Sequence, residues 1–451
     1  MYCEREVAKT VLAGRRLRAL RSIAGCCAGL LAIAFSGCGG AEQDPPEVEN
    51  PIASEIHDSG GIYIIENDRP PDGSRLDWRI GPEPAVSIGT REGEDPYLLH
   101  RVSDATRMRD GRIVVANGGS SELRFFDSLG NHLANRGGSG EGPGEFVFLR
   151  RVDPWPGDSI VAWEAPRLGF SVFDTHGSFG RTFTLLNPNP RPLRPSPESA
   201  ASATTPTGHQ GGPVPRGMSA EMLLWLPVSA TTDGGILAIA GGRDGNSTVV
   251  QVRDGEGGDL SSPVTHPGPE PMLLTQAYAG EPAVVPWGDL MIVTSTTRYE
   301  LKAFGRDGRL ARIVRRGHEL RAPTEAEVFA YMEENSPPGM SPEQIRRQFQ
   351  SLTVPEHFPA FGRIMTDAAG HLWVREYDLP DMERDAPLWT VFDAEGRVLG
   401  FVETPKDLGI YEIGEDYILG KVRDELMVEH VQLWPLACSA TIRMRSQRQT
   451  G

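Results

Sequence analysis

Cysteine is scarce in this chain, with only five among 451 residues. Three of the five, Cys3, Cys26 and Cys27, fall within the first 37 residues, and only Cys38 and Cys438 follow. Two cysteines cannot build a disulfide framework or a cysteine-based metal site. The ten histidines form no His-x-His and no His-Glu-x-x-His motif. The sequence therefore predicts no metal and no cofactor.

The motifs of common catalytic sites are missing as well. No Gly-x-Ser-x-Gly sequence marks a serine nucleophile. The glycine-rich stretch 137–144 lacks the Gly-Lys-Ser/Thr ending of a phosphate-binding loop, and it precedes a strand pattern instead of a helix. We therefore predict no catalytic residue and interpret these glycines as a crossover between structural units.

Basic residues are in the minority, with 45 lysines and arginines against 61 aspartates and glutamates. Outside the first 37 residues the counts are 39 and 59, a net charge of −20. Such a surface repels a phosphate backbone, and no basic cluster with interleaved aromatic residues offsets it. We therefore expect no nucleic-acid partner.

The first 37 residues have the pattern of an export signal. Arginines come first, at Arg15, Arg16, Arg18 and Arg21, and an apolar run at 23–35 follows that is too short to span a bilayer. The run ends in Ala34-Phe35-Ser36-Gly37-Cys38, which resembles the lipobox of bacterial lipoproteins. The resemblance implies a diacylglycerol on Cys38. The alternative is an ordinary secreted protein that is cleaved near this point.

The lipobox also implies a location. Acyl chains on one cysteine anchor a protein to a membrane without a transmembrane helix. Gly39 stands where retention at the inner membrane would need Asp, so we expect attachment to the outer membrane of a bacterial cell envelope. Residues 38–59 are polar and proline-rich, which predicts a flexible tether between that membrane and a folded domain.

Glycine and proline are abundant, at 52 and 37 residues, which favours many short strands joined by turns over a helical bundle. A glycine turn followed by a short apolar strand recurs six times, at Gly111, Gly157, Gly234, Gly288, Gly370 and Gly414. These glycines are separated by 46, 77, 54, 82 and 44 residues. A basic unit of about 45 to 50 residues is typical of a propeller blade, so the six copies predict six blades.

A second motif follows most copies of the first: a strand ending in an aromatic residue, then a turn with Asp and Gly. It occurs at 125–130, 172–177, 252–257, 303–308 and 391–396. The aromatic side chain is expected to pack inward, the Asp to bond the turn backbone, and the Gly to supply a positive φ. Two motifs in fixed order predict a four-stranded antiparallel blade.

The start of the domain is predicted to complete its last blade. Residues 85–102 parallel the junction at 136–152. They are expected to supply the outer strand of a blade whose other strands lie at about 416–436. Such a strand exchange closes the ring and removes free sheet edges.

These segments carry a resemblance to a known family. Residues 111–130 and 138–146 resemble an NHL-type repeat, and the chain from 60 to 436 resembles the bacterial six-bladed β-propeller lipoproteins, including their closing segments at 414–420 and 428–436. The third and fourth blades depart from the pattern, since Arg253 and Gly305 replace the expected aromatic residue and Asp. The resemblance implies a fold and a location, and no single activity.

Two inserts and a tail interrupt or follow the repeats. Residues 187–217 lack a hydrophobic face and predict a disordered loop, as do residues 437–451 at the end of the chain. Residues 319–360 contain two capping boxes, beginning at Thr324 and Ser341, which predict two short helices. This helical insert is expected to pack on one propeller face, either as a decorated loop or as a lid over a ligand site.

The innermost strand of each blade lines the central axis of a propeller, and three of these strands contain Arg before an aliphatic residue. The three are Arg101, Arg151 and Arg363. Arginines at similar heights would suit a carboxylate or sulfate group on a ligand. The alternative is that each arginine pairs with a blade carboxylate such as Asp104 or Asp153. Our candidate ligand-binding residues are Arg101, Asp104, Arg151 and Arg363.

Export, an anchor and the lack of a catalytic motif predict a membrane-anchored propeller that binds a peptide, glycan or envelope protein without catalysis. The alternative is a metal-dependent enzyme similar to propeller lactonases and lyases, whose ligands come from scattered inner strands and leave no linear motif. A third possibility is a scaffold within an envelope complex.

Overall fold

The computed structural model of the protein describes residues 52–165, 168–185, 225–242, 247–255, 258–267, 278, 280–336, 339–349, 354–382 and 384–437. These residues form six sheets, each built on four antiparallel strands. Within this part of the chain no helix is long and apolar enough to cross a membrane. The predicted loop at 187–217 lies outside the described residues.

The first three blades follow one another along the chain. Blade 1 consists of β5 (Val102–Arg107), β6 (Ile113–Asn117), β7 (Glu122–Phe126) and β8 (His132–Gly137). Blade 2 consists of β9 (Leu149–Trp155), β10 (Ser159–Glu164), β11 (Gly169–Phe173) and β12 (Phe179–Thr184). Blade 3 consists of β13 (Leu226–Ala230), β14 (Ile236–Gly241), β15 (Ser247–Arg253) and β16 (Val264–Pro267).

The last three blades complete the ring. Blade 4 contains β17 (Pro282–Trp287), β18 (Leu290–Ser295), β19 (Glu300–Phe304) and β20 (Leu310–Arg316). Blade 5 contains β21 (Ile364–Thr366), β22 (Leu372–Arg375), β23 (Leu388–Phe392) and β24 (Val398–Glu403). Blade 6 contains β25 (Gly409–Ile413), β26 (Tyr417–Arg423), β27 (Glu429–Ala437) and the N-terminal strand β4 (Val86–Ile88).

The first strands of successive blades lie against one another around the axis. They contact in the order β5, β9, β13, β17 and β21, and β25 contacts β5. The Arg363 guanidinium, just before β21, donates to the Ile410 carbonyl of β25 and so joins blade 5 to blade 6. The predicted six-bladed propeller is confirmed.

The apolar runs of the sequence become the second strand of each blade, which is buried on both faces. In blade 1, Ile113 packs into a core cluster shared with blade 6, and its neighbour Val114 packs into a cluster shared with blade 2. Both are fully buried. A strand covered on both sides needs a continuous apolar run instead of an alternating one, which explains the repeated Ile-Val and Ile-Leu pairs.

Glycine in the second motif is required by the neighbouring blade. Gly396 in the β23–β24 turn has φ +92°, and a Cβ built there would lie 2.5 Å from the Val314 Cγ2 atom of β20. Gly177 in blade 2 has φ +76°, and its Cβ would lie 2.9 Å from the Phe125 ring of blade 1. Each turn therefore packs its glycine against the preceding blade, in addition to using the left-handed backbone.

Replacing Gly396 by Ala is expected to destabilise the fold by about 2–3 kcal/mol, because the left-handed backbone costs about 1–2 kcal/mol and overpacking of Val314 adds to it. Gly370→Ala is the matched control. Gly370 has a similar φ of +90°, but the nearest atom to its Cβ is 3.9 Å away. Urea unfolding of both variants checks the difference, and equal losses would contradict the packing explanation.

The predicted strand exchange is present. Strand β4 pairs antiparallel with β27, with Ile88 opposite Val431 and Val86 opposite Leu433. The short strand β3 (Arg79–Ile80) pairs with the end of the same strand. The last blade is therefore completed by residues that precede the first blade. Strand β4 covers the outer edge of β27 and leads into blade 1.

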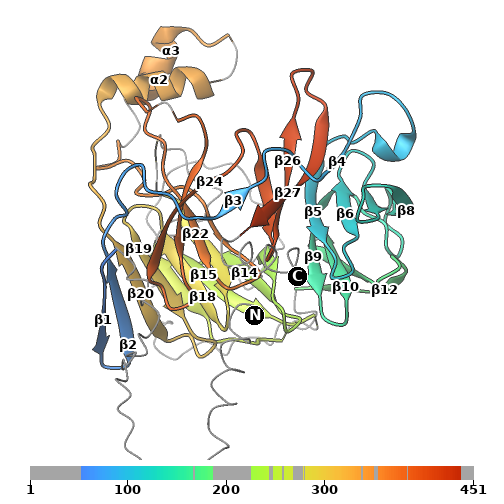
Figure 1. Ribbon diagram of the computed structural model, residues 1–451, viewed down its shortest axis with the longest axis horizontal. Helices are drawn as coiled ribbons and strands as arrows, with labels where there is room; N and C mark the ends of the chain where they lie inside the picture. Colours follow the sequence, from blue (N-terminus) through green and yellow to red (C-terminus); the bar gives the residue numbers. More distant parts are fainter. Residues whose placement is uncertain are drawn as a thin grey trace, which may run out of the picture.

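One N-terminal element differs from the sequence prediction. Residues 38–59 are predicted as a tether, but the last six of them form β1 (Ser54–Ser59), which pairs antiparallel with β2 (Ile62–Asn67). Strand β2 in turn pairs parallel with β20, so blade 4 has six strands (Figure 1). The physical reason is that Ile65 is 1% exposed in the core cluster between blades 4 and 5, and the Gly60-Gly61 turn allows the hairpin.

Both predicted helices of the insert at 319–360 are present. Helix α2 (Glu325–Asn335) has Thr324 as N-cap in a complete capping box, and α3 (Pro342–Phe349) begins after Ser341, which exchanges bonds with Gln344. Val328, Met332 and Ile345 form a small cluster that also contains Tyr278. The tail is predicted at 437–451, but Ala437 is still the last residue of β27, and residues 438–451 lie outside the described part.

The two ends of the propeller differ in the length of their loops. We call the hairpin face the end where the turns at 108–112 and 127–131 and their equivalents lie. The crossover face is the opposite end, where one blade connects to the next. The insert with α2 and α3 and the turn of the β26–β27 hairpin lie together at this end (Figure 1). Each first strand starts at the crossover face.

Candidate functional site

Three of the four candidate residues occupy equivalent positions around the axis. Asp104 of β5 pairs with Ala116, and Arg151 of β9 pairs with Trp163. The Arg363 carbonyl accepts from the Arg375 amide. The three partners, Ala116, Trp163 and Arg375, each stand three residues after the first fully buried residue in the second strand of their blade. Those buried residues are Ile113, Ile160 and Leu372. Asp104, Arg151 and Arg363 therefore share one level in blades 1, 2 and 5.

Arg101 does not share that level. It precedes β5, is exposed and has a left-handed φ of +52°. Arg101 stands ten residues before its hairpin glycine, whereas Arg151 stands six before and Arg363 seven before. Asp104 stands seven before Gly111, so counting back from the glycine identifies Asp104 as the equivalent residue in blade 1. The expectation of three arginines at one height is wrong for Arg101.

Arg151 is held by the two carboxylates nearest to it. Its Nε donates to both oxygens of Asp153, at 2.9 and 3.0 Å, and lies 3.6 Å from the Asp104 Oδ2 atom. Its Nη1 donates to the Val228 carbonyl in blade 3 at 2.5 Å. Burial acts to lower the pKa of Arg151, but the charges of Asp153 and Asp104 outweigh it and raise that pKa. For Arg151 the pairing alternative predicted from the sequence is correct.

Arg363 has the same position but no carboxylate. Its Nη1 donates to the Ile410 carbonyl at 2.8 Å, which repeats in blades 5 and 6 the bond that Arg151 makes from blade 2 to blade 3. Among the described residues it makes no ion pair, and its side chain is open to solvent. The surrounding protein and then the charge of Arg151 lower its pKa. Its guanidinium keeps donors free for an anion.

Asp104 is the carboxylate of this level that titrates near neutrality. Its oxygens accept from the backbone amides of Val152, at 3.2 Å, and Ala105, at 2.9 Å. Burial and the negative charge of Asp153 raise its pKa to about 7, against the lowering effect of Arg151. A buried carboxyl with a pKa near the working pH is a mark of functional sites.

Sequence reasoning missed Tyr411. It is the bulged residue of β25, where the pairing with β26 shifts between Ile410 and Glu412. Its hydroxyl donates to the Val102 carbonyl of blade 1 at 3.1 Å, and burial followed by the charge of Asp104 raises its pKa. A bulge turns a side chain away from the regular alternation, and it leaves no signal in the sequence. We call Asp104, Arg151, Asp153, Arg363 and Tyr411 the axial site.

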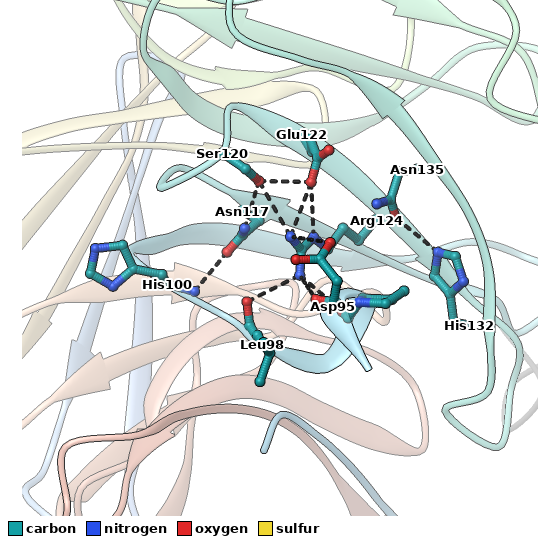
Figure 2. Close-up of polar contacts among 10 residues, drawn as sticks. Asp95, Leu98, His100, Asn117, Ser120, Glu122, Arg124, His132 and Asn135 are labelled. Atoms are coloured by element: carbon teal, nitrogen blue, oxygen red, sulfur yellow. Dashed lines mark hydrogen bonds and ion pairs between the residues drawn. The ribbon is translucent and has the colours of Figure 1, made fainter. Parts of the chain in front are cut away.

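A second polar cluster, around Arg124 in blade 1, supports the strand that carries Asp104 (Figure 2). Arg124 is 3% exposed. Its Nη1 donates to the carbonyls of Asp95, Pro96 and Leu98, in and just after the short helix η1 (Asp95–Tyr97), at 2.8–3.1 Å. Its Nε and Nη2 donate to Glu122. Because each of its nitrogens has a partner, this cluster positions the crossover and offers no free group to a ligand.

The side chain of Asn117 connects this cluster to the residues just before β5. Its Oδ1 accepts from the His100 amide at 2.8 Å, and its Nδ2 donates to Ser120 at 2.7 Å (Figure 2). Ser120 in turn donates to Glu122. The chain is thus fixed from η1 to the residue before Arg101.

No three His, Cys, Asp or Glu side chains in the described ranges are placed to hold a metal ion. Both carboxylates of the axial site already accept hydrogen bonds from the protein. Asp153 accepts from Arg151 and from the Ala230 amide, and Asp104 accepts from two backbone amides. The donor set of the axial site is therefore suited to an anion.

No protein-family model matches this chain, and no curated protein matches it. Among solved structures, it is similar to a putative exported protein from Bacteroides fragilis, with 13% identity, a TM-score of 0.44, and coverage of 83% of this chain and 99% of that one.

Two further solved structures are similar to this chain. A member of the DUF4221 family from Bacteroides vulgatus has 10% identity and a TM-score of 0.45, covering 80% of this chain and 99% of that one. A catalytically inactive virginiamycin B lyase from Staphylococcus aureus has 9% identity and a TM-score of 0.35, covering 80% and 100%. Because all three TM-scores are below 0.5, the fold assignment here rests on the strand pairing alone.

Proposed function

We propose that this propeller is an exported binding protein that holds the anionic group of a ligand, a carboxylate or a sulfate, at the axial site. The observation that carries the proposal is Arg363, just before the innermost strand of blade 5, whose guanidinium has one donor bound to the Ile410 carbonyl and no carboxylate partner among the described residues. Arg151 and Tyr411 are close enough to Arg363 to act on its pKa, Arg151 by lowering it and Tyr411 by raising it. A guanidinium fork binds a carboxylate or sulfate with two parallel hydrogen bonds.

The location is part of the same proposal and rests on the leader. We infer that the chain is exported, carries a lipid at Cys38 and is attached to the outer membrane of a bacterial envelope, as the lipobox resemblance and Gly39 imply. The ligand is then a component of the envelope or of the medium, such as an acidic glycan, a peptide or an envelope protein. No observation on the described residues favours the metal-dependent enzyme.

Arg363→Ala is expected to weaken binding of D-galacturonate, a simple sugar carboxylate, by about ten- to a hundredfold, because a hydrogen bond to a charged group contributes about 1.5–3 kcal/mol. The loss of its bond to Ile410 is expected to lower the free energy of unfolding by only about 1 kcal/mol. Calorimetric titration at about pH 6 measures the binding, with neutral D-galactose as the uncharged comparison.

Arg101→Ala is the matched control, since it removes the same charge from a residue outside the axial site. It is expected to leave the affinity unchanged. Equal weakening by both substitutions would show that only the net charge matters and would contradict the proposal. So would a wild-type protein that binds neither D-galacturonate nor sulfate. Arg151→Ala is not an equivalent test, because it leaves Asp153 and Asp104 without their cation.

A further inference from the structure

We infer that anion binding at the axial site takes up a proton, and that the carboxylate of Asp104 receives it. The inference rests on the proposed anion-binding function and adds the way in which that site is controlled.

The two carboxylates of the site are not equivalent. Asp153 receives the Arg151 Nε on both of its oxygens, at 2.9 and 3.0 Å. Asp104 lies 3.6 Å from the same nitrogen, which is too long for a hydrogen bond, and its own partners are two neutral amides. Both side chains are nearly buried, 12% exposed for Asp104 and 11% for Asp153. A proton entering the pair therefore goes to Asp104, whose negative charge is the less compensated.

The charged and titratable groups around Asp104 come from three neighbouring strands or their ends. Strand β9 contributes Arg151 and Asp153, and the residue before β21 contributes Arg363. Strand β25 contributes Tyr411 and Glu412, a buried carboxyl that accepts from Thr106 of β5 and interacts with the charge of Asp153. Strand β6, which pairs with β5, places Ala116 opposite Asp104 and adds no charge. With Asp104 ionised, the two aspartates already balance the two arginines, and Glu412 can only add negative charge, so the empty site has no excess of positive charge to offer an anion.

An arriving anion changes this balance. It must lie near Arg363, and therefore near Asp104, whose charge already acts on Arg363. Two negative charges in a partly dry site repel each other. Protonation of Asp104 removes the repulsion and leaves Arg363 and Arg151 facing the ligand with one excess positive charge. Since the pKa of Asp104 is already raised to about 7 by burial and Asp153, a bound anion raises it further.

The sign of the pH dependence follows from this linkage. Below about pH 7 Asp104 already carries its proton, and the affinity for an anion is at its maximum. Above that pH each binding event has to take up one proton, so the dissociation constant rises by about tenfold per pH unit. The carboxylate of galacturonate itself stays ionised throughout this range. Any pH dependence of the affinity therefore comes from the protein.

The experiment is calorimetric titration of the full-length protein with D-galacturonate from about pH 5.5 to about pH 8.5. Bis-Tris, imidazole and Tris are suitable buffers, because they differ in ionisation enthalpy and are not anions. The dependence of the measured heat on the buffer gives the number of protons taken up. We expect close to one at about pH 8 in the wild type, and none below about pH 6.

Asp104→Asn is expected to take up no proton and to bind with the same affinity at all these pH values, because the amide is neutral and its oxygen still accepts from Val152. Glu164→Gln is the matched control. Glu164 is also buried, at 9% exposed, and accepts from the Val147 amide in the crossover segment just before β9, outside the axial site. Its variant is expected to keep the wild-type proton uptake and pH profile.

Three results would overturn the inference: wild-type binding without proton uptake, uptake that persists in Asp104→Asn, or uptake that is lost in Glu164→Gln as well. Each of them leaves anion binding itself intact. Wild-type protein that binds no anion even at about pH 5.5 would instead remove the proposed function, and the inference with it. The wild-type measurement stands even if Asp104→Asn fails to fold.

Discussion

Glu376→Ala is expected to lower the free energy of unfolding by about 3–5 kcal/mol, because it leaves a buried arginine without its counter-charge. Glu376 follows β22, and its two oxygens accept from Arg316 Nη1 at 2.7 Å and Nη2 at 3.1 Å. The Arg316 side chain is fully buried at the end of β20, with its Cζ atom 3.8 Å from the centre of the Tyr299 ring. The pair joins blade 4 to blade 5.

The other partners of Glu376 add to this effect. Thr390 donates to Glu376 at 2.7 Å, and the Tyr299 hydroxyl approaches it at 3.4 Å. Removing the carboxylate therefore leaves Arg316 Nη2 and the hydroxyls of Thr390 and Tyr299 without this acceptor, whereas Arg316 Nη1 keeps its bond to the Thr390 oxygen. Equilibrium unfolding in urea measures the loss.

Two variants separate the buried charge from simple loss of contacts. Glu403→Ala removes a carboxylate that pairs with Arg75 at the surface, and it is expected to cost less than about 1 kcal/mol. Replacing Arg316 and Glu376 together, by Met and Leu, is expected to recover much of the stability, since paired buried charges are often replaceable by apolar groups. If the double variant is as unstable as Glu376→Ala, the unpaired charge is not the cause.

The fold was predictable from the sequence because its unit is repeated. The glycines at 111, 157, 234, 288, 370 and 414 all lie in or beside the turn between the first and second strands of a blade, as expected. The comparison of residues 85–102 with 136–152 correctly identified β4 as the missing outer strand of blade 6. In each case the same sequence pattern occurs in several blades, because each blade has to pack against its neighbours in the same way. A clear copy of the pattern in one blade therefore supports the interpretation of a weaker copy in another.

The axial site was predictable only in part, because side chains on a first strand do not follow a repeated rule. Arg151 and Arg363 share a level, but the same level carries Asp104 in blade 1. Bulges at Ser103, Arg150 and Tyr411 shift the alternation from blade to blade. Arg151 pairs with Asp153 two residues along its own strand, which the sequence does record. The bonds of Arg151 and Arg363 to carbonyls of the next blade join residues at distances in sequence that no local pattern records.

The hairpin β1–β2 was missed because it has no counterpart in the repeat. The segment from Ser54 to Ile88 runs along the outer strands of three blades in succession. Strand β2 pairs with β20 of blade 4, the Leu76 amide donates to the Phe401 carbonyl of β24 in blade 5, and β4 pairs with β27 of blade 6. We call residues 54–88 the N-terminal belt. The sequence predicted the closing strand β4, whereas the pairing of β1 with β2 and of β2 with β20 depends on tertiary contacts that no repeat in the sequence indicates.

Asn67 links the belt to two blades at once, and Asn67→Ala is expected to destabilise the protein by about 3 kcal/mol, since buried backbone groups lose their partners at about 1–3 kcal/mol each. Asn67 is 5% exposed. Its Nδ2 donates to the Arg315 carbonyl of blade 4 at 2.9 Å and to the Gly396 carbonyl of blade 5 at 3.0 Å. Its Oδ1 accepts from the Val398 amide at 2.9 Å.

The measurement is urea unfolding combined with amide hydrogen exchange. In Asn67→Ala, exchange is expected to accelerate at Val398, because its amide loses the Asn67 Oδ1 as acceptor. It is also expected to accelerate along β2, because the last residue of β2 loses its side-chain bonds to blades 4 and 5. Ser54→Ala is the control, since it removes only the bond from the β1 hydroxyl to the Asn67 Oδ1, and it is expected to cost less than about 1.5 kcal/mol. If the belt only lies on the surface, both variants will lose the same small amount of unfolding free energy. If the belt holds blades 4 and 5 together, Asn67→Ala will lose clearly more than Ser54→Ala.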